Sequence, residues 1–292
     1  MDSPESSHRL STEVLAGGDG FQVVSTRWSR PRHPSESHDC LPYAAIEFMQ
    51  SGSFRKHVRG RTVVGDPNTV VFFNPDEPFG VLHPHGHQNR GVTIRLFGDF
   101  FTEACSEFPN PGGRFVERLS SKTHAVTSPS LHLRLHRLVR GLIRAAPGDP
   151  LEVEESVLGI VHESLGVMFA PQFRAPDRSP RRTSVSADRR LVAAIEYLGE
   201  HFARKLTLQE LGRATGCSSW RICRVFSDGV GIPVHRYLSR LRLREALARM
   251  SDGEVDLTQV ALAAGFGSHS HFTAAFRREF GATPRAVRGA YG

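Results

Sequence analysis

A short helical pattern that contains a turn occurs twice in the last hundred residues of the chain, about fifty residues apart. Each copy has a glycine, a serine, a phenylalanine eight positions after that serine, and a closing glycine: Gly216, Ser218, Phe226 and Gly231 in the first copy, and Gly265, Ser268, Phe276 and Gly281 in the second. Serine is favoured just before a helix and glycine just after one. The repeat therefore predicts two small helical units of the same design.

Nearly all of the sequence after residue 187 has the periodicity of helices. Six helices are expected, at Leu191–Phe202, Leu208–Thr215, Ser219–Ser227, Val234–Met250, Leu257–Ala264 and His269–Phe280. Thr207 with Glu210, and Asp256 with Gln259, have the spacing of a capping box at two of the helix starts. We therefore expect an all-α C-terminal domain, residues 188–292, with helix-turn-helix units at about 206–228 and 256–280 joined by a long helix.

The first hundred residues have a different pattern, that of short strands separated by turn residues. The clearest expected strands are Phe21–Trp28, Tyr43–Met49, Ser53–Val58 and Thr69–Phe73. Two apolar helical stripes follow, in Ser130–Ala145 and Leu151–Phe169. Residues 171–187 combine three prolines with polar and basic residues, as linkers do. The sequence thus predicts an α+β protein with a small β-barrel or sandwich and appended helices in residues 1–170, a linker at 171–187, and the helical domain.

Length, charge and cysteine content restrict the class of protein further. At 292 residues the chain has room for two domains. Residues 1–170 carry 17 basic and 19 acidic side chains, whereas residues 188–292 carry 16 and 10, so the positive charge lies where phosphates would be bound. The sequence has no apolar run of membrane-spanning length, no secretion signal at its start and no Cys-x-x-Cys pair. We expect a cytoplasmic protein that does not contact a membrane.

The second helix of each unit has the residues that a major-groove reader needs, with one face for packing and another with donors for base edges. In the first unit the outward face is expected to hold Trp220, Cys223, Arg224 and Ser227, of which Arg224 is suited to a bidentate contact with guanine. A solvated surface arginine is the alternative. In the second unit the expected face is His269, Ser270, Thr273, Ala274 and Arg277, with Arg277 or Arg278 for phosphate contacts.

At these residues the chain resembles the AraC/XylS family of bacterial transcription regulators. The resemblance runs from about Leu191 to Val287 and includes Tyr237-Leu238-x-x-x-Arg242-Leu243-x-x-Ala246 in the joining helix, and Val260-Ala261-x-x-x-Gly265-Phe266 through Pro284. It implies that the two reading helices enter successive major grooves of promoter DNA. By matching position it implicates Trp220, Cys223, Arg224, His269, Ser270, Thr273 and Ala274, although Ala274 stands where the family often has arginine.

Family members with a long N-terminal part commonly carry a cupin-like sensing barrel there, followed by helices that dimerise. The resemblance therefore implies a small-molecule effector of unknown identity, a homodimer and RNA polymerase as a further partner. We expect a regulator with no catalytic residue, no metal and no cofactor.

A histidine cluster supports the alternative function. His83, His85 and His87 alternate as on a strand, so they can share a metal, and Pro-x-Gly-x-x-His within Pro78–His83 is a fragment seen in cupin barrels. The alternative is a metal-dependent cupin enzyme joined to a nucleic-acid-binding domain. Against it, Pro84 and Gly86 interrupt the strand, and no glutamate follows at the spacing of catalytic cupins. The preferred interpretation is a polar strand end whose histidines face solvent or an organic ligand.

Overall fold

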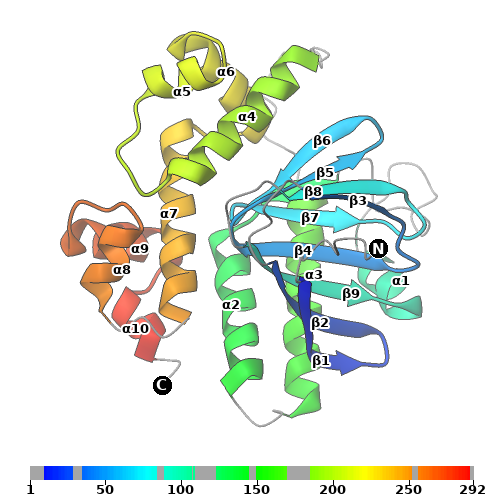
Figure 1. Ribbon diagram of the computed structural model, residues 1–292. Helices are drawn as coiled ribbons and strands as arrows, with labels where there is room; N and C mark the ends of the chain where they lie inside the picture. Colours follow the sequence, from blue (N-terminus) through cyan, green and yellow to red (C-terminus); the bar gives the residue numbers. More distant parts are fainter. Residues whose placement is uncertain are drawn as a thin grey trace, which may run out of the picture. The chain divides into compact units, whose positions relative to one another are not determined.

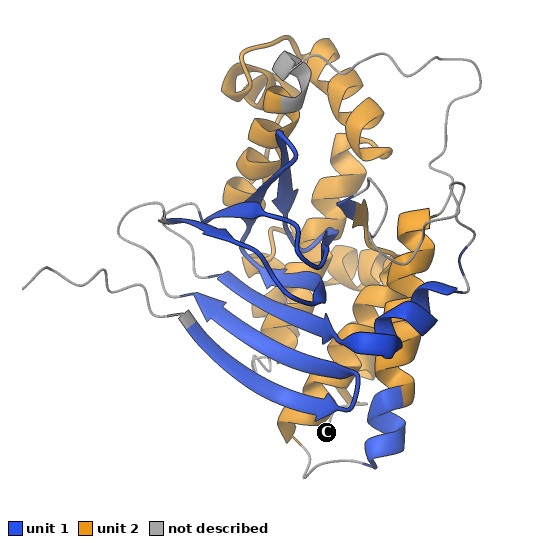
Figure 2. Cartoon of the chain, turned by 90° about the vertical axis from the view of Figure 1, so that its right-hand side faces the viewer, with its two compact units in different colours: residues 1–124, 149–154 blue, residues 125–148, 155–292 orange. Residues whose placement is uncertain are grey.

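A computed structural model of the chain describes residues 10–28, 35–83, 89–106, 108, 123–144, 149–169, 185–251 and 256–289. The chain forms two compact units, residues 1–124 with 149–154 and residues 125–148 with 155–292, which Figure 2 shows in two colours. The expected linker at 171–187 lies largely outside the described residues. Residues 125–148 and 155–169, which belong to the expected N-terminal domain, are grouped by their contacts with the C-terminal helices, and the expected domain boundaries stay a prediction. None of the helices in the described ranges combines the length and apolar character that a membrane crossing requires.

The first unit is built from antiparallel strands arranged in two sheets (Figure 1). One sheet has the order β1-β2-β9-β4-β7-β10, and the other has the order β3-β8-β5-β6. The strands are β1 (Leu10–Gly18), β2 (Phe21–Trp28), β3 (Ser35–Asp39), β4 (Ala44–Ser51), β5 (Phe54–Val58), β6 (Arg61–Gly65), β7 (Thr69–Phe73), β8 (Phe79–His83), β9 (Asn89–Leu96) and β10 (His124–Val126). Four of these strands were expected within about two residues of their observed bounds.

The two sheets share an apolar core. Side chains from β4 and β7 of the larger sheet pack against side chains from β5, β6 and β8 of the smaller one: Ala45, Met49, Val71, Phe73, Phe54, Val58, Val63 and Phe79. Alternation along each strand places every second residue in this space. The arrangement confirms the β-rich N-terminal part of the expected α+β fold.

Three helices lie between β9 and residue 169. They are α1 (Gly98–Ser106), α2 (Pro129–Arg144) and α3 (Pro150–Phe169). The apolar stripe expected on α2 was made up of Leu131, Leu135, Leu138, Leu142 and Ile143. This prediction is partly wrong, because Ile143 is 58% exposed. The buried face of α2 includes instead three polar residues at successive turns, His132, His136 and Arg140.

Five of the six expected C-terminal helices begin at the expected residue, whereas the first begins at Val185 instead of Leu191 and the third ends at Val230 instead of Ser227. They are α4 (Val185–His201), α5 (Leu208–Ala214), α6 (Ser219–Val230), α7 (Val234–Ser251), α8 (Leu257–Ala263), α9 (His269–Phe280) and α10 (Pro284–Gly289). Thr207 and Glu210 form both hydrogen bonds of a capping box at α5, and Asp256 caps α8. Helix α10 was not expected.

Helix α7 contributes to two separate cores (Figure 1). Its first turns, including Val234 and Tyr237, pack with α4, α5 and α6. Its later turns, from Leu243 to Met250, pack with α8, α9 and α10. The expected long joining helix therefore holds two helix-turn-helix units, one near each of its ends.

Candidate nucleic-acid interface

Helix α6 presents the outward face that the sequence predicted. Ser218 caps its start by accepting a hydrogen bond from the backbone N–H of Arg221, and Gly231 ends it with φ of +82°. Ile222 and Phe226 are fully buried, and Phe226 packs edge-on against Tyr237 of α7 with the ring centroids 5.1 Å apart. On the other side Trp220, Arg224 and Ser227 are exposed and Cys223 is half-buried. The helix therefore has a buried packing face and a separate exposed face.

Arg224 and Trp220 form a small cluster on this face. The guanidinium carbon of Arg224 lies 5.7 Å from the centroid of the Trp220 ring, and Nε lies 3.7 Å from Oδ2 of Asp228. Trp220 is 72% exposed, which is unusual for so large an apolar side chain. An exposed aromatic ring beside an exposed guanidinium suits a partner with both apolar and acceptor groups, such as a base-pair edge.

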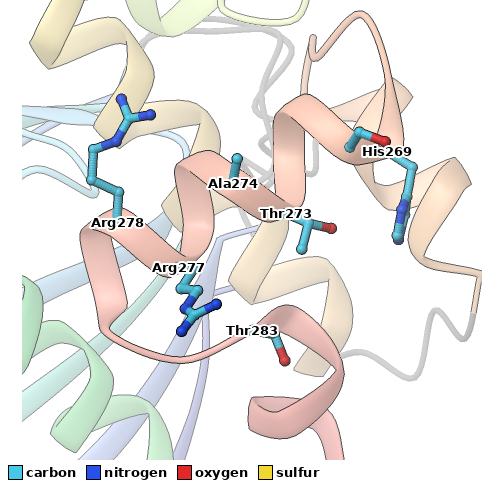
Figure 3. Close-up of a pocket in the computed structure, with 7 residues that line it drawn as sticks. His269, Thr273, Ala274, Arg277, Arg278 and Thr283 are labelled. Carbon is cyan, nitrogen blue, oxygen red and sulfur yellow. The ribbon is translucent and has the colours of Figure 1, made fainter.

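Helix α9 repeats the design of α6. Ser268 caps its start by accepting from the N–H of His271, and Gly281 ends it with φ of +74°. Phe272, Phe276 and Phe280 form the buried face. The opposite face lies along a groove of about 730 Å³ whose lining includes all five expected reading residues of this helix (Figure 3): His269, Ser270, Thr273, Ala274 and Arg277, together with Arg278 and Thr283.

Thr273 lies at the centre of this surface. Its Oγ1 is buried and has no hydrogen-bond partner. An unpartnered buried hydroxyl costs free energy unless it gains a partner. In Figure 3 its side chain lies between those of His269 and Arg277, which are both exposed. The face thus offers an imidazole, a hydroxyl and a guanidinium in that order along about two turns of helix.

Sequence reasoning missed the contribution of α10. A second groove, of about 530 Å³, lies beside the first and shares His269, Thr273 and Thr283 with it. Arg285 and Arg288 of α10 also line it. The signal was present as Thr283-Pro284, since a threonine cap followed by proline marks a helix start, and Thr283 Oγ1 accepts from the N–H of Ala286. The two arginines add positive charge next to the reading face.

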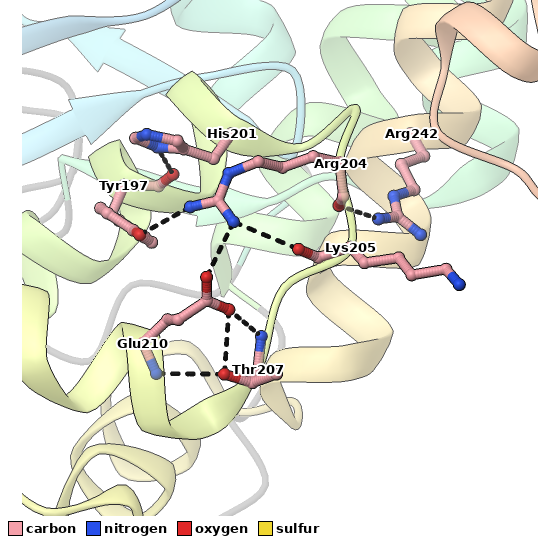
Figure 4. A network of polar contacts seen from close by, with 7 residues as sticks. All are labelled: Tyr197, His201, Arg204, Lys205, Thr207, Glu210 and Arg242. Carbon is pink, nitrogen blue, oxygen red and sulfur yellow. Dashed lines mark hydrogen bonds and ion pairs between the residues drawn. The ribbon is translucent and has the colours of Figure 1, made fainter.

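A polar network connects the first helix-turn-helix unit to the joining helix, α7 (Figure 4). Arg242 of α7 donates from Nε to the carbonyl oxygen of Phe202 at 2.7 Å, and from Nη2 to that of Arg204 at 2.8 Å. Arg204 in turn donates to Glu210 at 2.9 Å and to the Tyr197 hydroxyl at 2.8 Å. These bonds explain the arginine of the joining-helix pattern, because it satisfies carbonyl groups at the end of α4.

The turn of the second unit approaches the same segment closely. Gly265 has φ of +83°, and a Cβ there would lie 2.7 Å from the carbonyl oxygen of Ala203. Only glycine fits such a conformation and approach without strain. Gly216, with φ of +64°, turns the chain at the matching place in the first unit.

Two buried ionisable side chains of the β-rich unit, Glu47 and Lys56, have pKa values shifted by burial. Glu47 of β4 accepts from Thr93 through Oε2, while its Oε1 has no hydrogen-bond partner, and burial raises its pKa to about 7. Lys56 of β5 donates to the carbonyl oxygen of Phe72 at 2.6 Å and lies 4.0 Å from the centroid of the Phe73 ring. Burial lowers the pKa of Lys56 to about 8. Burial of an ionisable group costs free energy of folding, so such groups are uncommon in a core whose only role is structural.

One groove of the same unit combines polar and apolar walls. It has a volume of about 740 Å³, and its lining includes Tyr43, Phe101, Arg59, Asp76 and Glu77. Arg59 and Asp76 have φ of +50° and +53°, values that non-glycine residues adopt rarely. Arg59 is ion-paired with Glu77. Such strained backbone positions cluster at binding sites.

The histidine cluster is described in part. His83 ends β8 and is buried, with its Nδ1 3.2 Å from Asn89 Nδ2 and its ring 4.6 Å from that of Trp28. Burial lowers its pKa to about 4. His83 was expected to face solvent or an organic ligand; its burial contradicts the first of these, and contact with an organic ligand stays a prediction. His85 and His87 lie outside the described residues, and within the described ones no group of three His, Cys, Asp or Glu side chains is arranged to hold a metal.

Comparison with known proteins accounts for both parts of the chain. Residues 21–161 match the family described as an AraC-like ligand binding domain, and residues 211–290 match a helix-turn-helix domain. The chain belongs to the AraC family. The cupin-like N-terminal domain and the helical C-terminal domain expected from the sequence are thereby confirmed.

Among AraC-family relatives, the HTH-type transcriptional activator RhaS of Klebsiella pneumoniae is 33% identical over 101 residues. This match covers 35% of the chain and 36% of RhaS, so the chain spans about a third of that relative's length. A transcriptional regulator from Chromobacterium violaceum is 26% identical over 35% of this chain and 92% of its own, with a TM-score of 0.34. ToxT from Vibrio cholerae is 12% identical over 92% of this chain and 97% of its own, also with a TM-score of 0.34.

Proposed function

We propose that the protein is a sequence-specific DNA-binding transcription regulator in which α6 and α9 each enter a major groove. One observation carries this proposal: the five reading residues expected on α9 line a single groove together with a basic side chain, on the face opposite a phenylalanine core. A helix that reads bases needs this separation of faces. The membership of the AraC family supports the same function.

Arg224 is the base reader of the first unit. Its exposed guanidinium is suited to the O6 and N7 acceptors of guanine, and Trp220 beside it is suited to a thymine methyl group or a sugar. Cys223 and Ser227 complete the surface that faces the bases. Because Asp228 is an exposed carboxylate one turn further along, the guanidinium exchanges this ion pair for the base contact on binding.

In the second helix-turn-helix unit, Thr273 and His269 approach the bases. Ser270 and Ala274 pack against the DNA beside these two residues. Ala274 cannot donate a hydrogen bond, so it contributes apolar contact only. Arg277 and Arg285 bind phosphates on either side of this face, because both are exposed and basic and line adjoining grooves. The second unit therefore draws more of its affinity from the DNA backbone than the first.

The N-terminal domain, residues 1–170, binds a small-molecule effector and provides dimerisation. The C-terminal domain, residues 188–292, binds promoter DNA through α6 and α9. The unpartnered Oε1 of Glu47 and the groove beside Arg59 and Tyr43 support an effector with hydrogen-bonding groups. An effector regulates by binding two arrangements of the protein with different affinity. A dimer reads paired half-sites and recruits RNA polymerase, and the protein acts without catalysis.

The test is selection of DNA from a random-sequence pool by the full-length protein, with Arg224→Ala and Arg277→Ala as variants. The proposal expects one enriched sequence with two parts a helical turn apart. Arg224→Ala should remove base preference in one part, while Arg277→Ala should weaken binding of all sequences. Enrichment of no sequence, with or without metabolite extracts, would refute sequence-specific binding.

The effector is tested separately by thermal unfolding of the full-length protein with a panel of metabolites. A ligand that binds only the folded state raises the melting temperature, and the rise grows with the logarithm of the ligand concentration above Kd. Glu47→Gln should reduce the rise for an effector that contacts this carboxyl group. A panel that produces no rise would count against effector sensing.

A further inference from the structure

Helix α2 contacts the C-terminal end of α7 through hydrogen bonds from charged donors. Arg140 donates through Nη1 to the carbonyl oxygen of Ser251, and that atom lies 3.5 Å from the carbonyl oxygen of Met250. The last carbonyl groups of a helix lack partners within the helix and carry its negative partial charge. A buried guanidinium at this end therefore satisfies the carbonyl groups and complements the helix dipole.

A second contact lies two turns earlier on α7. Arg244 is 0% exposed, and its Nη2 donates to the carbonyl oxygen of Thr127 at 3.0 Å. Thr127 is buried and comes just before α2 in the chain. A fully buried guanidinium requires hydrogen-bond partners inside the protein. The segment that leads into α2 therefore supplies a carbonyl group that α7 needs.

Ser251 and Leu133 complete this surface. The Ser251 hydroxyl lies 3.0 Å from the His136 ring, and it also donates to the carbonyl oxygen of Leu247 at 3.0 Å. Leu133 of α2 is buried in the same apolar cluster as Phe276 of α9. Helix α2 thus adds both polar and apolar contacts to the second helix-turn-helix unit.

The contacts described above between the α2 region and α7 lie in the half of α7 that packs with α9. Arg244 and Ser251 lie in the later turns of α7, which pack with α8, α9 and α10. Arg240 joins α7 to Glu279 of α9 through an ion pair at 2.9 Å. The first reader, α6, is held instead by the early turns of α7 and by α4 and α5.

We propose that α2 is a positioning element of the DNA-binding unit, in which Arg140 and Arg244 fix the later turns of α7 and thereby the placement of the second reader, α9. The part of this proposal that concerns DNA binding rests on the proposed function. The stabilisation of α8 and α9 by α2 does not depend on DNA. It extends the DNA-reading structure beyond residues 188–292 to include a helix from the sensing region.

The first experiment measures amide hydrogen exchange in the full-length protein without DNA, in the wild type, Arg140→Met and Arg137→Ala. Methionine keeps much of the packing volume of Arg140 but removes its donors, and Arg137 is an exposed arginine on the same helix. Arg140→Met should speed exchange about tenfold in α8 and α9 while leaving α5 and α6 unchanged. Arg137→Ala should match the wild type. Unchanged exchange in α8 and α9, or equal acceleration in α5 and α6, would overturn the proposal.

The second experiment repeats the DNA selection with Arg140→Met. Base preference in the part of the site read by α6 should persist, whereas preference in the part read by α9 should be lost and Kd for the full site should rise about tenfold. The part read by α9 is assigned with His269→Ala, which removes preference there alone. Retention of both parts would contradict the positioning role. If the wild type selects no sequence, the proposed function fails. The hydrogen-exchange experiment then tests by itself whether α2 stabilises α8 and α9.

Discussion

The Nε atom of Arg224 lies 3.7 Å from Oδ2 of Asp228, one helical turn further along α6. Asp228 is 68% exposed at its side chain, so water screens this pair and its net contribution to stability is small. The same carboxylate stands on the helix that approaches DNA phosphates in the proposed complex. Its negative charge therefore opposes binding while it orients the guanidinium in the free protein.

Asp228→Asn should bind DNA more tightly than the wild type. Loss of a like charge near phosphates favours binding by about 1 kcal/mol, which is about fivefold in Kd at low salt, and the gain should shrink as salt screens it. Fluorescence anisotropy with a labelled duplex over a salt series measures this. Glu200→Gln, which removes an exposed charge on α4, serves as the control. Weaker binding by Asp228→Asn would show that the ion pair positions Arg224.

Arg224→Ala should lose about 1 to 3 kcal/mol of binding to the selected sequence, because a bidentate guanine contact discriminates by that amount. Binding to scrambled DNA should change little. Competition between the two duplexes gives the ratio directly, with Arg213→Ala on α5 as a control for a general loss of positive charge. An equal loss on both duplexes would identify Arg224 as a phosphate contact.

Arg285→Ala should weaken binding to every sequence alike. A phosphate contact releases counterions, so the slope of log Kd against log salt should fall in magnitude by about 1. Titrations at four or more salt concentrations determine the slope. The slope would stay at the wild-type value if α10 did not approach the DNA.

The contribution of Glu47 to the stability of the β-rich unit should fall as pH rises. Burial raises the pKa of Glu47 to about 7, so its stabilising contribution is complete below the unfolded value of 4.5 and is lost as pH rises through 7. The full difference by pH 8 is roughly 3 kcal/mol. Glu47→Gln should remove this dependence and be the more stable form at pH 8, as thermal unfolding would measure. A steeper loss of stability in Glu47→Gln would contradict this.

The helical unit should become less stable as pH falls. Burial lowers the pKa of His136 to about 3 and that of His132 well below its usual value, with Arg140, Arg137 and Arg244 adding to the effect. The unfolded chain takes up protons below pH 6.5 while these folded histidines do not, so stability falls from about pH 7 downward. For His136 the loss reaches roughly 3 kcal/mol by pH 4. His136→Gln should show a flatter profile between pH 7 and pH 4 in urea unfolding.

The sequence predicted the reading helices well because their signals are local. Ser218, Thr207, Asp256 and Ser268 cap helices by bonding to backbone groups two or three residues away, and Phe226 and Phe276 follow the helical period. Such features need no knowledge of the rest of the fold.

The buried polar face of α2 could not be found in the same way. His132, His136 and Arg140 look like surface residues in the sequence, and their burial depends on α7, which lies more than a hundred residues further along the chain. Strands such as β3 and β6 were also missed, because edge strands carry polar residues and lack a strong alternating pattern. The candidate effector site in the β-rich unit could not be predicted for a related reason. Glu47 belongs to no sequence motif, and it stands out only because its buried Oε1 has no hydrogen-bond partner.

Helix α7 has 18 residues and no glycine or proline within it, so its two ends keep a fixed separation and angle. One inserted residue would lengthen it by about 1.5 Å and rotate everything beyond it by about 100°. In the proposed complex, such a change would turn α9 away from the groove that follows the one proposed for α6. If both helices read DNA, the length of α7 sets the distance between the two parts of the site, and we expect only one spacing between those parts to be bound.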